Sequence, residues 1–398
     1  MIRLLSPLFL ALSFSSAFAQ QAGQIHVWGD DSFGQIANAP RGADYIQVAG
    51  GGSHALALKV DGSLVSWGDD GSGQVSNTPP GAGFVRVAAG NGASHALRSD
   101  GSIASWGYDR DGQVSNTPPG TGFVEVSSSL HSVALKTDGS LVSWGNDLFR
   151  QVSDTPTGKD FVSVSATGYH SVALKTDGSL VSWGNDLFGQ VSNTPTGNDF
   201  AQMAGGKSFS AAVRTDGSLV VWGADSSGQI SNTPPGKDFA QIAAGTEHVL
   251  ALRTDGSVVG WGDDSFGQAS LVPPGISFGQ ISGGMFFSLG IEGSGASPHL
   301  AVTNLVSGSV AKVTIDYASP NNIVYFVWSA SGGGPINTPF GAGYVSQPIH
   351  IIPLSTDLSG HAELNQNVPA GLAGANVWFH GADYGSATML NNIAATIG

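Results

Sequence analysis

Two polar positions recur along this chain with side chains that could do chemistry. An aspartate stands three residues after each of seven tryptophans, and four histidines share one repeat position: Asp31, Asp70, Asp109, Asp147, Asp186, Asp225 and Asp264, then His54, His131, His170 and His248. Several carboxylates close together can bind Ca²⁺, and a histidine can bind a metal or act as a base. These two sets are the first candidates for a site.

The surrounding pattern favours a structural role for both sets. No unit has the dense Asp/Asn spacing of a calcium loop, and an aspartate in a turn accepts hydrogen bonds from the backbone of that turn. The histidine position becomes Phe209 in one unit, which indicates a buried packing position. No Ser-His-Asp arrangement or paired carboxylates stand outside the repeats, and the Gly-rich segments read as turns. We therefore expect no enzymatic activity, no catalytic residue, no metal and no cofactor.

The elements that carry these residues form a repeat. Trp28, Trp67, Trp106, Trp144, Trp183, Trp222 and Trp261 are each followed by Gly and are separated by 39, 39, 38, 39, 39 and 39 residues. An Asp-Gly pair between alternating apolar residues precedes the last six, which predicts hairpins with type I′ turns. Each unit continues through a Gln-Val or Gln-Ile segment and a proline loop to a further strand. About four strands per unit match a propeller blade.

The two ends of the repeat are complementary. The first unit begins near Gln24 with the second half of the pattern, and residues 278–293 end the array with the first half. Combining the two halves in one blade removes free sheet edges. The sequence therefore predicts an all-β fold with a closed seven-bladed β-propeller over residues 20–296.

The regions outside the repeats have other signatures. Residues 1–19 combine Arg3, an apolar run and a small-residue site, which predicts a signal peptide cleaved after Ala19 and a location outside the cell or in its envelope. We expect no membrane span elsewhere. In residues 297–398, about seven alternating stretches separated by turn residues predict a small immunoglobulin-like β-sandwich, an accessory domain. The stretches are residues 299–306, 310–317, 323–329, 348–354, 362–368, 376–380 and 389–397.

Composition narrows the class of partner. The chain has 398 residues, 58 of them Gly, no Cys, 41% hydrophobic residues and a formal net charge of −14. Because an acidic surface repels phosphate backbones, we expect no nucleic-acid partner. A chain of this length buries enough surface to fold without a disulfide or metal, and we expect a monomer.

The order Gly-x-x-His-Ser-x-Ala-Leu, Asp-Gly, Trp-Gly and Gly-Gln over residues 24–293 resembles the regulator-of-chromosome-condensation repeat family. This resemblance implies a seven-bladed propeller. In its signal peptide and short repeats the chain resembles the exported bacterial beta-lactamase inhibitor propellers more than the nuclear exchange factors. The same ring carries several functions in the family, and an acidic exported ring argues against guanine nucleotide exchange.

Variation between the units indicates which face binds. The Asp-Gly turns and proline loops are nearly constant, whereas the turns expected on the other face change and carry aromatic, apolar and basic residues. Such residues are enriched at binding patches. The candidate contact residues are Phe33, Tyr108, Arg110, Leu148, Phe149, Tyr169, Leu187, Phe188, Lys207, Phe266, Met285 and Phe286. The alternative is that Phe33, Phe149, Phe188 and Phe266 fill gaps between blades.

These residues lead to three functional hypotheses. The first is an exported, non-catalytic propeller that binds a protein or a cell-surface glycan through the variable face. The second is a secreted protein that binds or degrades polysaccharide through the same aromatics. The third is an inhibitor of a beta-lactamase-type enzyme.

One unit departs from the repeat. Gly precedes the fixed Gln in six units, but Arg150 occupies this position in the fourth. If the position requires a positive φ, Arg150 strains its turn by about 1–2 kcal/mol.

Overall fold

The computed structural model describes residues 22–293 in full and, beyond them, only the strands of the C-terminal part without side chains. The predicted signal peptide, residues 1–19, lies outside the described residues. Every element assigned in the described part is a β-strand, and no helix there is long and apolar enough to cross a membrane. The all-β prediction is confirmed.

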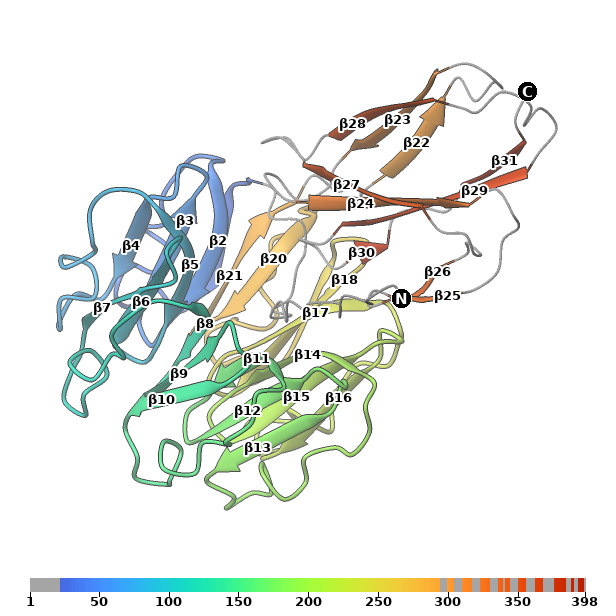
Figure 1. Ribbon diagram of the computed structural model, residues 1–398. Coiled ribbons are helices and arrows are strands. Elements are labelled where there is room, and N and C mark those ends of the chain that lie inside the picture. Colours follow the sequence, from blue (N-terminus) through green and yellow to red (C-terminus); the bar gives the residue numbers. More distant parts are fainter. Residues whose placement is uncertain are drawn as a thin grey trace.

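Seven antiparallel sheets of three strands make up residues 22–293 (Figure 1). Their strands are β1 (Ile25–Gly29), β2 (Tyr45–Gly50), β3 (His54–Lys59), β4 (Leu64–Gly68), β5 (Phe84–Ala89), β6 (Ala93–Arg98), β7 (Ile103–Gly107), β8 (Phe123–Ser128), β9 (His131–Lys136), β10 (Leu141–Gly145), β11 (Phe161–Ala166), β12 (His170–Lys175), β13 (Leu180–Gly184), β14 (Phe200–Gly205), β15 (Phe209–Arg214), β16 (Leu219–Gly223), β17 (Phe239–Ala244), β18 (His248–Arg253), β19 (Val258–Gly262), β20 (Phe278–Gly283) and β21 (Phe287–Glu292).

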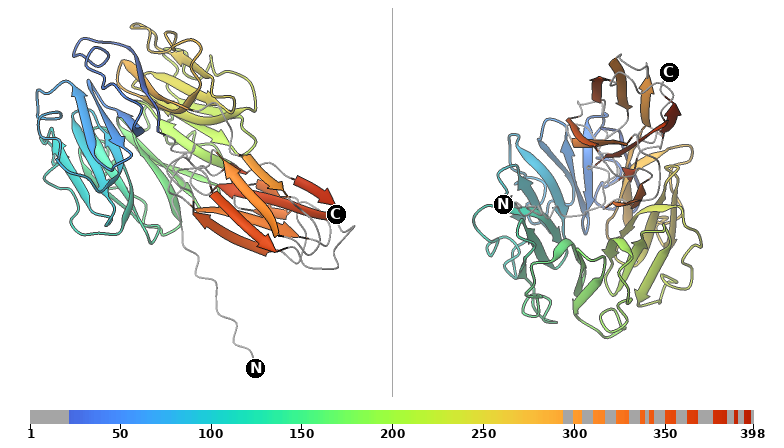
Figure 2. Two further views of the ribbon diagram at one scale, coloured as in Figure 1. Left: turned by 90° about the horizontal axis from the view of Figure 1, so that it is seen from above. Right: turned by 45° about the vertical axis from the view of Figure 1, so that its right-hand side comes forward.

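Six of the sheets follow the chain in consecutive triplets, from β2-β3-β4 to β17-β18-β19. The seventh joins the two ends of the repeat array, because β1 pairs with β21 in the order β1-β21-β20, with Val27 opposite Leu289. The prediction that both ends contribute to one sheet is confirmed. Figure 2 shows the sheets standing side by side like blades.

The hairpin turns differ from the type I′ geometry expected for Asp-Gly. In the hairpin of β12 and β13, Gly178 N–H donates to the Lys175 carbonyl at 3.0 Å and Lys175 N–H donates to the Ser179 carbonyl at 2.9 Å. Only the glycine has a positive φ, 82° for Gly178, whereas type I′ requires a positive φ at both central residues. The loop therefore has three residues and ends in a left-handed glycine, and the type I′ prediction is wrong.

The expected fourth strand of each unit is also absent, and the described blades have three strands. The Gln-Val segment forms a turn, because Asp186 Oδ1 accepts the N–H groups of Val191 and Ser192 at 2.8 Å each. Backbone groups that bond a side chain in this way are unavailable to a neighbouring strand. The aspartate three residues after each Trp thus replaces a strand with a turn.

Each Trp packs across the interface to the preceding sheet. Trp222 is buried with Val172 and Leu174 of β12 and with Phe200. The indole Nε1–H of Trp222 donates to the carbonyl of Gln190 at 3.0 Å, and every other repeat Trp donates to the corresponding Gln carbonyl. The core therefore lies between sheets, and burial fixes the position of one blade against the next.

The C-terminal strands form sheets of their own. They are β22 (His299–Thr303), β23 (Val310–Asp316), β24 (Ile323–Ser329), β25 (Ile336–Thr338), β26 (Gly341–Gly343), β27 (His350–Ser355), β28 (Ala362–Asn367), β29 (Asn376–Asp383), β30 (Thr388–Met389) and β31 (Ile393–Thr396). The sheet orders are β22-β23-β28, β27-β24-β29-β30 with β31 on β29, and β25-β26. Each of the seven stretches predicted to be strands overlaps at least one of these, and the immunoglobulin-like arrangement stays a prediction.

Candidate ligand-binding face

The turns that vary between units share one face, named here the variable face. It consists of the turn between the first and second strand of each sheet and the turn after each Trp-Gly. Asn185, after Trp183-Gly184, donates its N–H to the Tyr169 carbonyl at 3.0 Å, and Asp30 N–H donates to the Phe286 carbonyl at 2.9 Å. The Asp-Gly turns instead bond the start of the next unit, as Phe200 N–H does to the Gly178 carbonyl. The two sets of turns therefore lie at opposite ends of the sheets.

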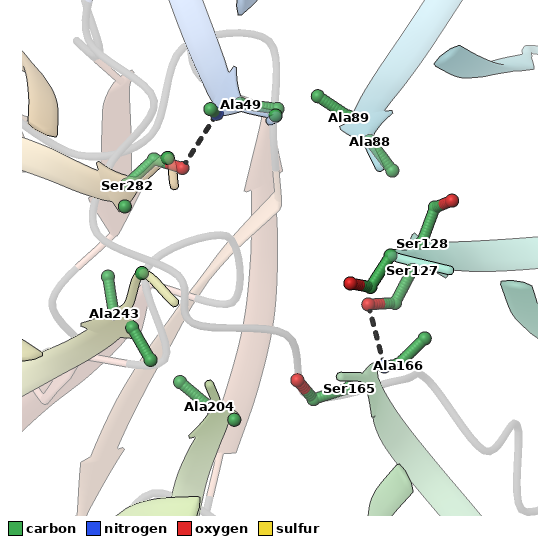
Figure 3. Close-up of a pocket in the computed structure, with 18 of the residues that line it drawn as sticks. Ala49, Ala88, Ala89, Ser127, Ser128, Ser165, Ala166, Ala204, Ala243 and Ser282 are labelled. Carbon is green, nitrogen blue, oxygen red and sulfur yellow. Dashed lines mark hydrogen bonds between the residues drawn. The ribbon is translucent and has the colours of Figure 1, made fainter. Parts of the chain in front are cut away.

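A central channel opens at the variable face. Its volume is about 560 Å³, and it is lined by the first strands of all seven sheets, β2, β5, β8, β11, β14, β17 and β20. Alanine, serine and glycine fill the part of these strands near the face, among them Ala49, Ala89, Ser128 and Ala204 (Figure 3). Two backbone N–H groups bond serine hydroxyls there: Gly50 donates to Ser282 at 3.1 Å and Ala166 to Ser127 at 2.9 Å. Because these side chains are short, the channel stays wide.

The structure divides the twelve predicted contact residues into three groups. Four line the mouth of the channel: Tyr169, Lys207, Met285 and Phe286. Six are exposed on the outer part of the variable face: Phe33, Tyr108, Arg110, Leu148, Leu187 and Phe188. The remaining two, Phe149 and Phe266, are half-buried and exposed respectively, and connect the groups.

Two aromatic pairs join neighbouring sheets at the channel mouth. Phe149, after β10, packs edge-on against Tyr169, before β12, with ring centroids 5.2 Å apart. Phe266, after β19, packs against Phe286, before β21, at 5.4 Å. Both phenylalanines therefore contact an aromatic ring of the neighbouring sheet, while Phe266 is still 47% exposed. Edge-on and tilted pairs of this kind contribute about 0.5–1.5 kcal/mol beyond their burial.

The outer tips are more open. Leu148 and Leu187 are 75% and 77% exposed, and Phe188 is 53% exposed. The residue that faces Phe188 by repeat position is Ser208, where Tyr169 faces Phe149. Apolar side chains with this exposure contribute little to the fold and are available to a partner.

Acidic residues are concentrated on the variable face. Its turns contain thirteen carboxylates and three basic side chains: Asp30, Asp31, Asp69, Asp70, Asp109, Asp111, Asp147, Asp154, Asp186, Asp225, Glu247, Asp263 and Asp264, with Arg110, Arg150 and Lys207. The opposite end contains eleven carboxylates and nine basic side chains. They are Asp44, Asp61, Asp100, Asp138, Asp160, Asp177, Asp199, Asp216, Asp238, Asp255 and Glu292, with Arg41, Lys59, Arg98, Lys136, Lys159, Lys175, Arg214, Lys237 and Arg253.

The two ends of the sheets therefore differ in net charge and in electrostatic potential. At the opposite end, cations pair with carboxylates, as Arg214 does with Asp199 at 2.6 Å and Lys159 with Asp138 at 2.8 Å. The variable face carries most of the negative charge of the repeat region, in a ring around the channel mouth. Summed charge of one sign attracts ligands of the other sign and raises the rate of encounter.

The repeated aspartates and histidines have structural roles. The backbone N–H groups of Ser231 and Ile230 lower the pKa of Asp225, and the equivalent aspartate in every other unit accepts two N–H groups of its own turn. Burial lowers the pKa of His170 to about 3 and that of His248 to about 4. These histidines are neutral packing groups, as their exchange for Phe209 predicts.

Sequence reasoning missed one position on the channel wall. It follows the first aromatic of each first strand by two residues and reads Gln47, Arg86, Glu125, Ser163, Gln202, Gln241 and Gln280. Glu125, Gln202, Gln241 and Gln280 line the channel. The sequence did carry a signal for this position. It is polar within an otherwise apolar strand, and in two adjacent units it holds a charged residue, Arg86 and Glu125.

The family comparisons agree with this architecture. The regulator of chromosome condensation (RCC1) repeat matches residues 45–74, 161–190, 200–229 and 239–268. Each matched segment begins at the aromatic that opens a first strand and ends at the fixed Gln. Among curated proteins, no sequence matches the chain.

Solved structures show the same fold at low identity. Prp20p of Saccharomyces cerevisiae is 20% identical with a TM-score of 0.58, covering 72% of this chain and 94% of that one. Yeast RCC1 (Prp20) bound to Kap60 is 19% identical with a TM-score of 0.60, and the match covers 74% of this chain and 96% of that one. The ectodomain of the receptor kinase CR4 from Physcomitrella patens is 21% identical with a TM-score of 0.53, and the match covers 66% of this chain and 76% of that one. The chain thus contains four segments that match the RCC1 repeat, and its fold is similar to that of these solved structures.

Proposed function

We propose that this chain is an exported, closed seven-bladed propeller that binds a basic protein through its variable face without catalysing a reaction. The observation that carries the proposal is the difference between the two ends of the sheets. One end combines exposed apolar tips with a ring of carboxylates, whereas the other consists of repeated turns and paired charges. The C-terminal strands act as an accessory domain in this proposal.

The chemistry of the face supports a protein as the ligand. Leu148, Leu187 and Phe188 offer apolar contact area, and the carboxylates around them attract lysine and arginine side chains. Two of the similar yeast structures concern protein binding: Prp20p is described with its binding to Gsp1p and histones, and yeast RCC1 (Prp20) is bound to Kap60. A protein-binding scaffold is the function that this fold most readily supports.

The two tips can be tested with substitutions taken from the chain itself. Ser226 and Ser227 occupy the positions of Leu187 and Phe188 in another unit, so L187S/F188S installs a turn sequence that the fold already uses. Val85, 41% exposed on β5 next to the residue that bonds the Asp-Gly turn at Gly62, provides the matched control V85S. The three full-length proteins are immobilised and exposed to secreted proteins of the native organism.

We expect wild type and V85S to capture the same basic protein and L187S/F188S to lose it. The affinity should fall as salt rises, because mobile ions screen the carboxylates. If L187S/F188S folds and keeps every partner, the variable face is not the binding surface. If the partner is neutral or acidic and its affinity does not depend on salt, the face binds by apolar contact alone.

A glycan ligand is the second candidate, favoured by the half-buried rings of Tyr169 and Phe286 at the channel mouth. Aromatic faces can stack on sugar rings. A glycan array with wild type and Y169S/F286S distinguishes this candidate, because glycan binding would be lost in Y169S/F286S and unaffected by salt.

A further inference from the structure

A glutamine clamp joins neighbouring sheets along the channel wall. Gln202 Oε1 accepts the N–H of Ile242 at 2.8 Å, and its Nε2 donates to the carbonyl of the same residue at 3.3 Å. Gln241 holds Ile281 in the same way, at 3.0 and 3.1 Å. Each amide therefore satisfies both backbone groups of one residue in the next sheet.

Glu125 occupies the clamp position between the third and fourth sheets, β8-β9-β10 and β11-β12-β13. Its Oε1 accepts hydrogen bonds, as the glutamine Oε1 does, from the Ser163 hydroxyl at 3.1 Å and from the Val164 N–H at 3.5 Å. Its Oε2 is buried and has no hydrogen-bond partner among the described residues. In the glutamine clamps this place belongs to an N–H that donates to a carbonyl, and an ionised carboxylate has no hydrogen to donate.

The surroundings favour the neutral form of Glu125. Burial raises the pKa of the Glu125 carboxyl to about 7, although the charge of Arg86 and the hydrogen bonds from Ser163 and Val164 lower it. Arg86 stands at the clamp position of the preceding sheet, on β5. The packed strand β11 contains no ionisable residue.

The other ionisable groups near this strand have their own contacts. On β9, His131 hydrogen-bonds Ser171 and Lys136 lies over the ring of Phe123. Among the described residues that line the channel, Lys207 at the mouth is the only other charged one. Arg86 is therefore the main counter-charge for an ionised Glu125.

We propose that Glu125 holds a proton in the folded protein and that its Oε2–H donates to the Val164 carbonyl, which completes the clamp in the way that glutamine does elsewhere. Loss of this proton places a carboxylate oxygen against a carbonyl oxygen and opens the clamp between the third and fourth sheets. The Phe149–Tyr169 pair bridges the same two sheets at the channel mouth. Protonation of one buried side chain thus controls an interface below a group that we assign to ligand binding.

The sign of the effect on stability follows from linkage. A carboxyl with a raised pKa binds its proton more tightly in the folded state than in the unfolded state, so stability is fully present below the unfolded pKa. It is lost as the pH rises toward about 7, the folded pKa of Glu125. The ratio of folded to unfolded protein should fall by a factor on the order of 100 across this window.

The test exchanges the two clamp residues between sheets. E125Q installs the amide that the other clamps use, and Q241E installs the carboxylate in a clamp that has an amide. Urea unfolding of full-length wild type, E125Q and Q241E is measured from pH 5 to pH 8. Differences between variants at each pH isolate the clamp from other titrating groups.

We expect E125Q to exceed wild type in stability at pH 8, with the difference shrinking toward pH 5. Q241E should match wild type near pH 5 and fall below it as the pH rises. The infrared C=O stretch of a protonated carboxyl should be present in wild type at pH 6 and absent in E125Q. Equal pH profiles for wild type and E125Q would overturn the proposal. If E125Q does not fold, a Q241E profile parallel to wild type would overturn it equally.

Discussion

His170 on β12 and Ser210 on β15 hydrogen-bond across the interface between two neighbouring sheets, with Nε2 2.6 Å from Oγ. The other ring nitrogen, Nδ1, lies 2.8 Å from Thr167 Oγ1, and the Thr167 hydroxyl donates to the His170 carbonyl. Because that hydroxyl has one hydrogen, Nδ1–H must donate to Thr167 and Nε2 must accept from Ser210. The sheets therefore meet through a neutral histidine of defined tautomer.

This relationship recurs with matched chemistry around the sheets. Where the histidine is present, the residue that faces it in the next sheet is serine: His54 with Ser94, His131 with Ser171, His170 with Ser210 and His248 with Ser288. Where phenylalanine replaces histidine, the facing position is apolar, Val249 for Phe209 and Ala55 for Phe287. On β6 the histidine position holds Ala93, and His95, two residues later, bonds Ser132 at 3.0 Å.

The first prediction is that His170 and Ser210 are energetically coupled. H170F should destabilise the protein by about 1–3 kcal/mol, because it leaves the Ser210 hydroxyl buried without a partner. The double variant H170F/S210V introduces the residues of the native Phe209–Val249 pair and should recover part of this loss, because Thr167 stands where that unit has Gly206 beneath the Phe209 ring. Urea unfolding of the wild type, both single variants and the double variant gives the coupling energy. Additive effects of the two substitutions would show that the hydrogen bond contributes nothing to stability.

The second prediction concerns acid unfolding. Burial lowers the pKa of five histidines from 6.5, to about 3 for His95, His131 and His170 and to about 4 for His54 and His248. A group whose pKa is lower in the folded state stabilises the protein above its unfolded pKa. That stability is lost as the pH falls from about 6.5 toward 3, at about 1.4 kcal/mol per unit of pKa difference for each histidine.

Unfolding measured from pH 7 to pH 4 should therefore show a steep loss of stability. In H170F/S210V the loss should be smaller by the contribution of one histidine. Above pH 7 the double variant and wild type should have parallel profiles. A double variant with the same acid slope as wild type would mean that His170 is protonated in the folded state.

The sequence predicted the frame of the molecule because that frame depends on short-range rules repeated seven times. Trp-Gly spacing and the alternation around Asp177-Gly178 indicated the hairpins, and the incomplete end units predicted the β1–β21 pairing. The fourth strand was mispredicted because Asp186 bonds two N–H groups of the Gln-Val segment. Pattern alone does not show which backbone groups a side chain will take.

The parts that escaped prediction are contacts between units. Ser210 hydrogen-bonds His170, which lies 40 residues away in the chain, and Glu125 hydrogen-bonds Val164, which lies 39 residues away. Both contacts cross the interface between two neighbouring sheets. Their significance appears only when each position is compared with the facing position of the next unit. The contact candidates were identified by their variation, but whether Phe149 packs on Tyr169 while Phe188 is exposed depends on the residue opposite.

The third prediction is that Arg150 strains its turn. Its φ is 64°, and it is the only non-glycine residue of the described chain with a positive φ, whereas Gly189 in the next unit has 77°. R150G should stabilise the protein by about 1 kcal/mol, since glycine adopts this conformation without steric cost. The ion pair of Arg150 with Asp154, 3.1 Å long, is exposed and offsets little of this gain.

The reciprocal variant is the control. G189R should cost more than R150G gains, because a Cβ at Gly189 would lie 2.2 Å from Asn193 Nδ2, where the fourth unit has Asp154. Thermal unfolding of both variants checks the pair. A neutral R150G would mean that the arginine makes compensating contacts.

The fourth prediction is that β1 stabilises the whole array as the third strand of the last sheet. Trp28 Nε1–H donates to the Gln268 carbonyl at 2.9 Å, and Trp28 packs against Phe278. Deleting residues 20–29 removes these contacts and leaves the edge of β21 unpaired, which favours pairing with another chain. We expect a lower unfolding temperature and concentration-dependent association by size-exclusion chromatography, whereas deletion of residues 20–22 should change neither. A monomer of unchanged stability after the longer deletion would show that the sheets hold together without the strand that joins the two ends.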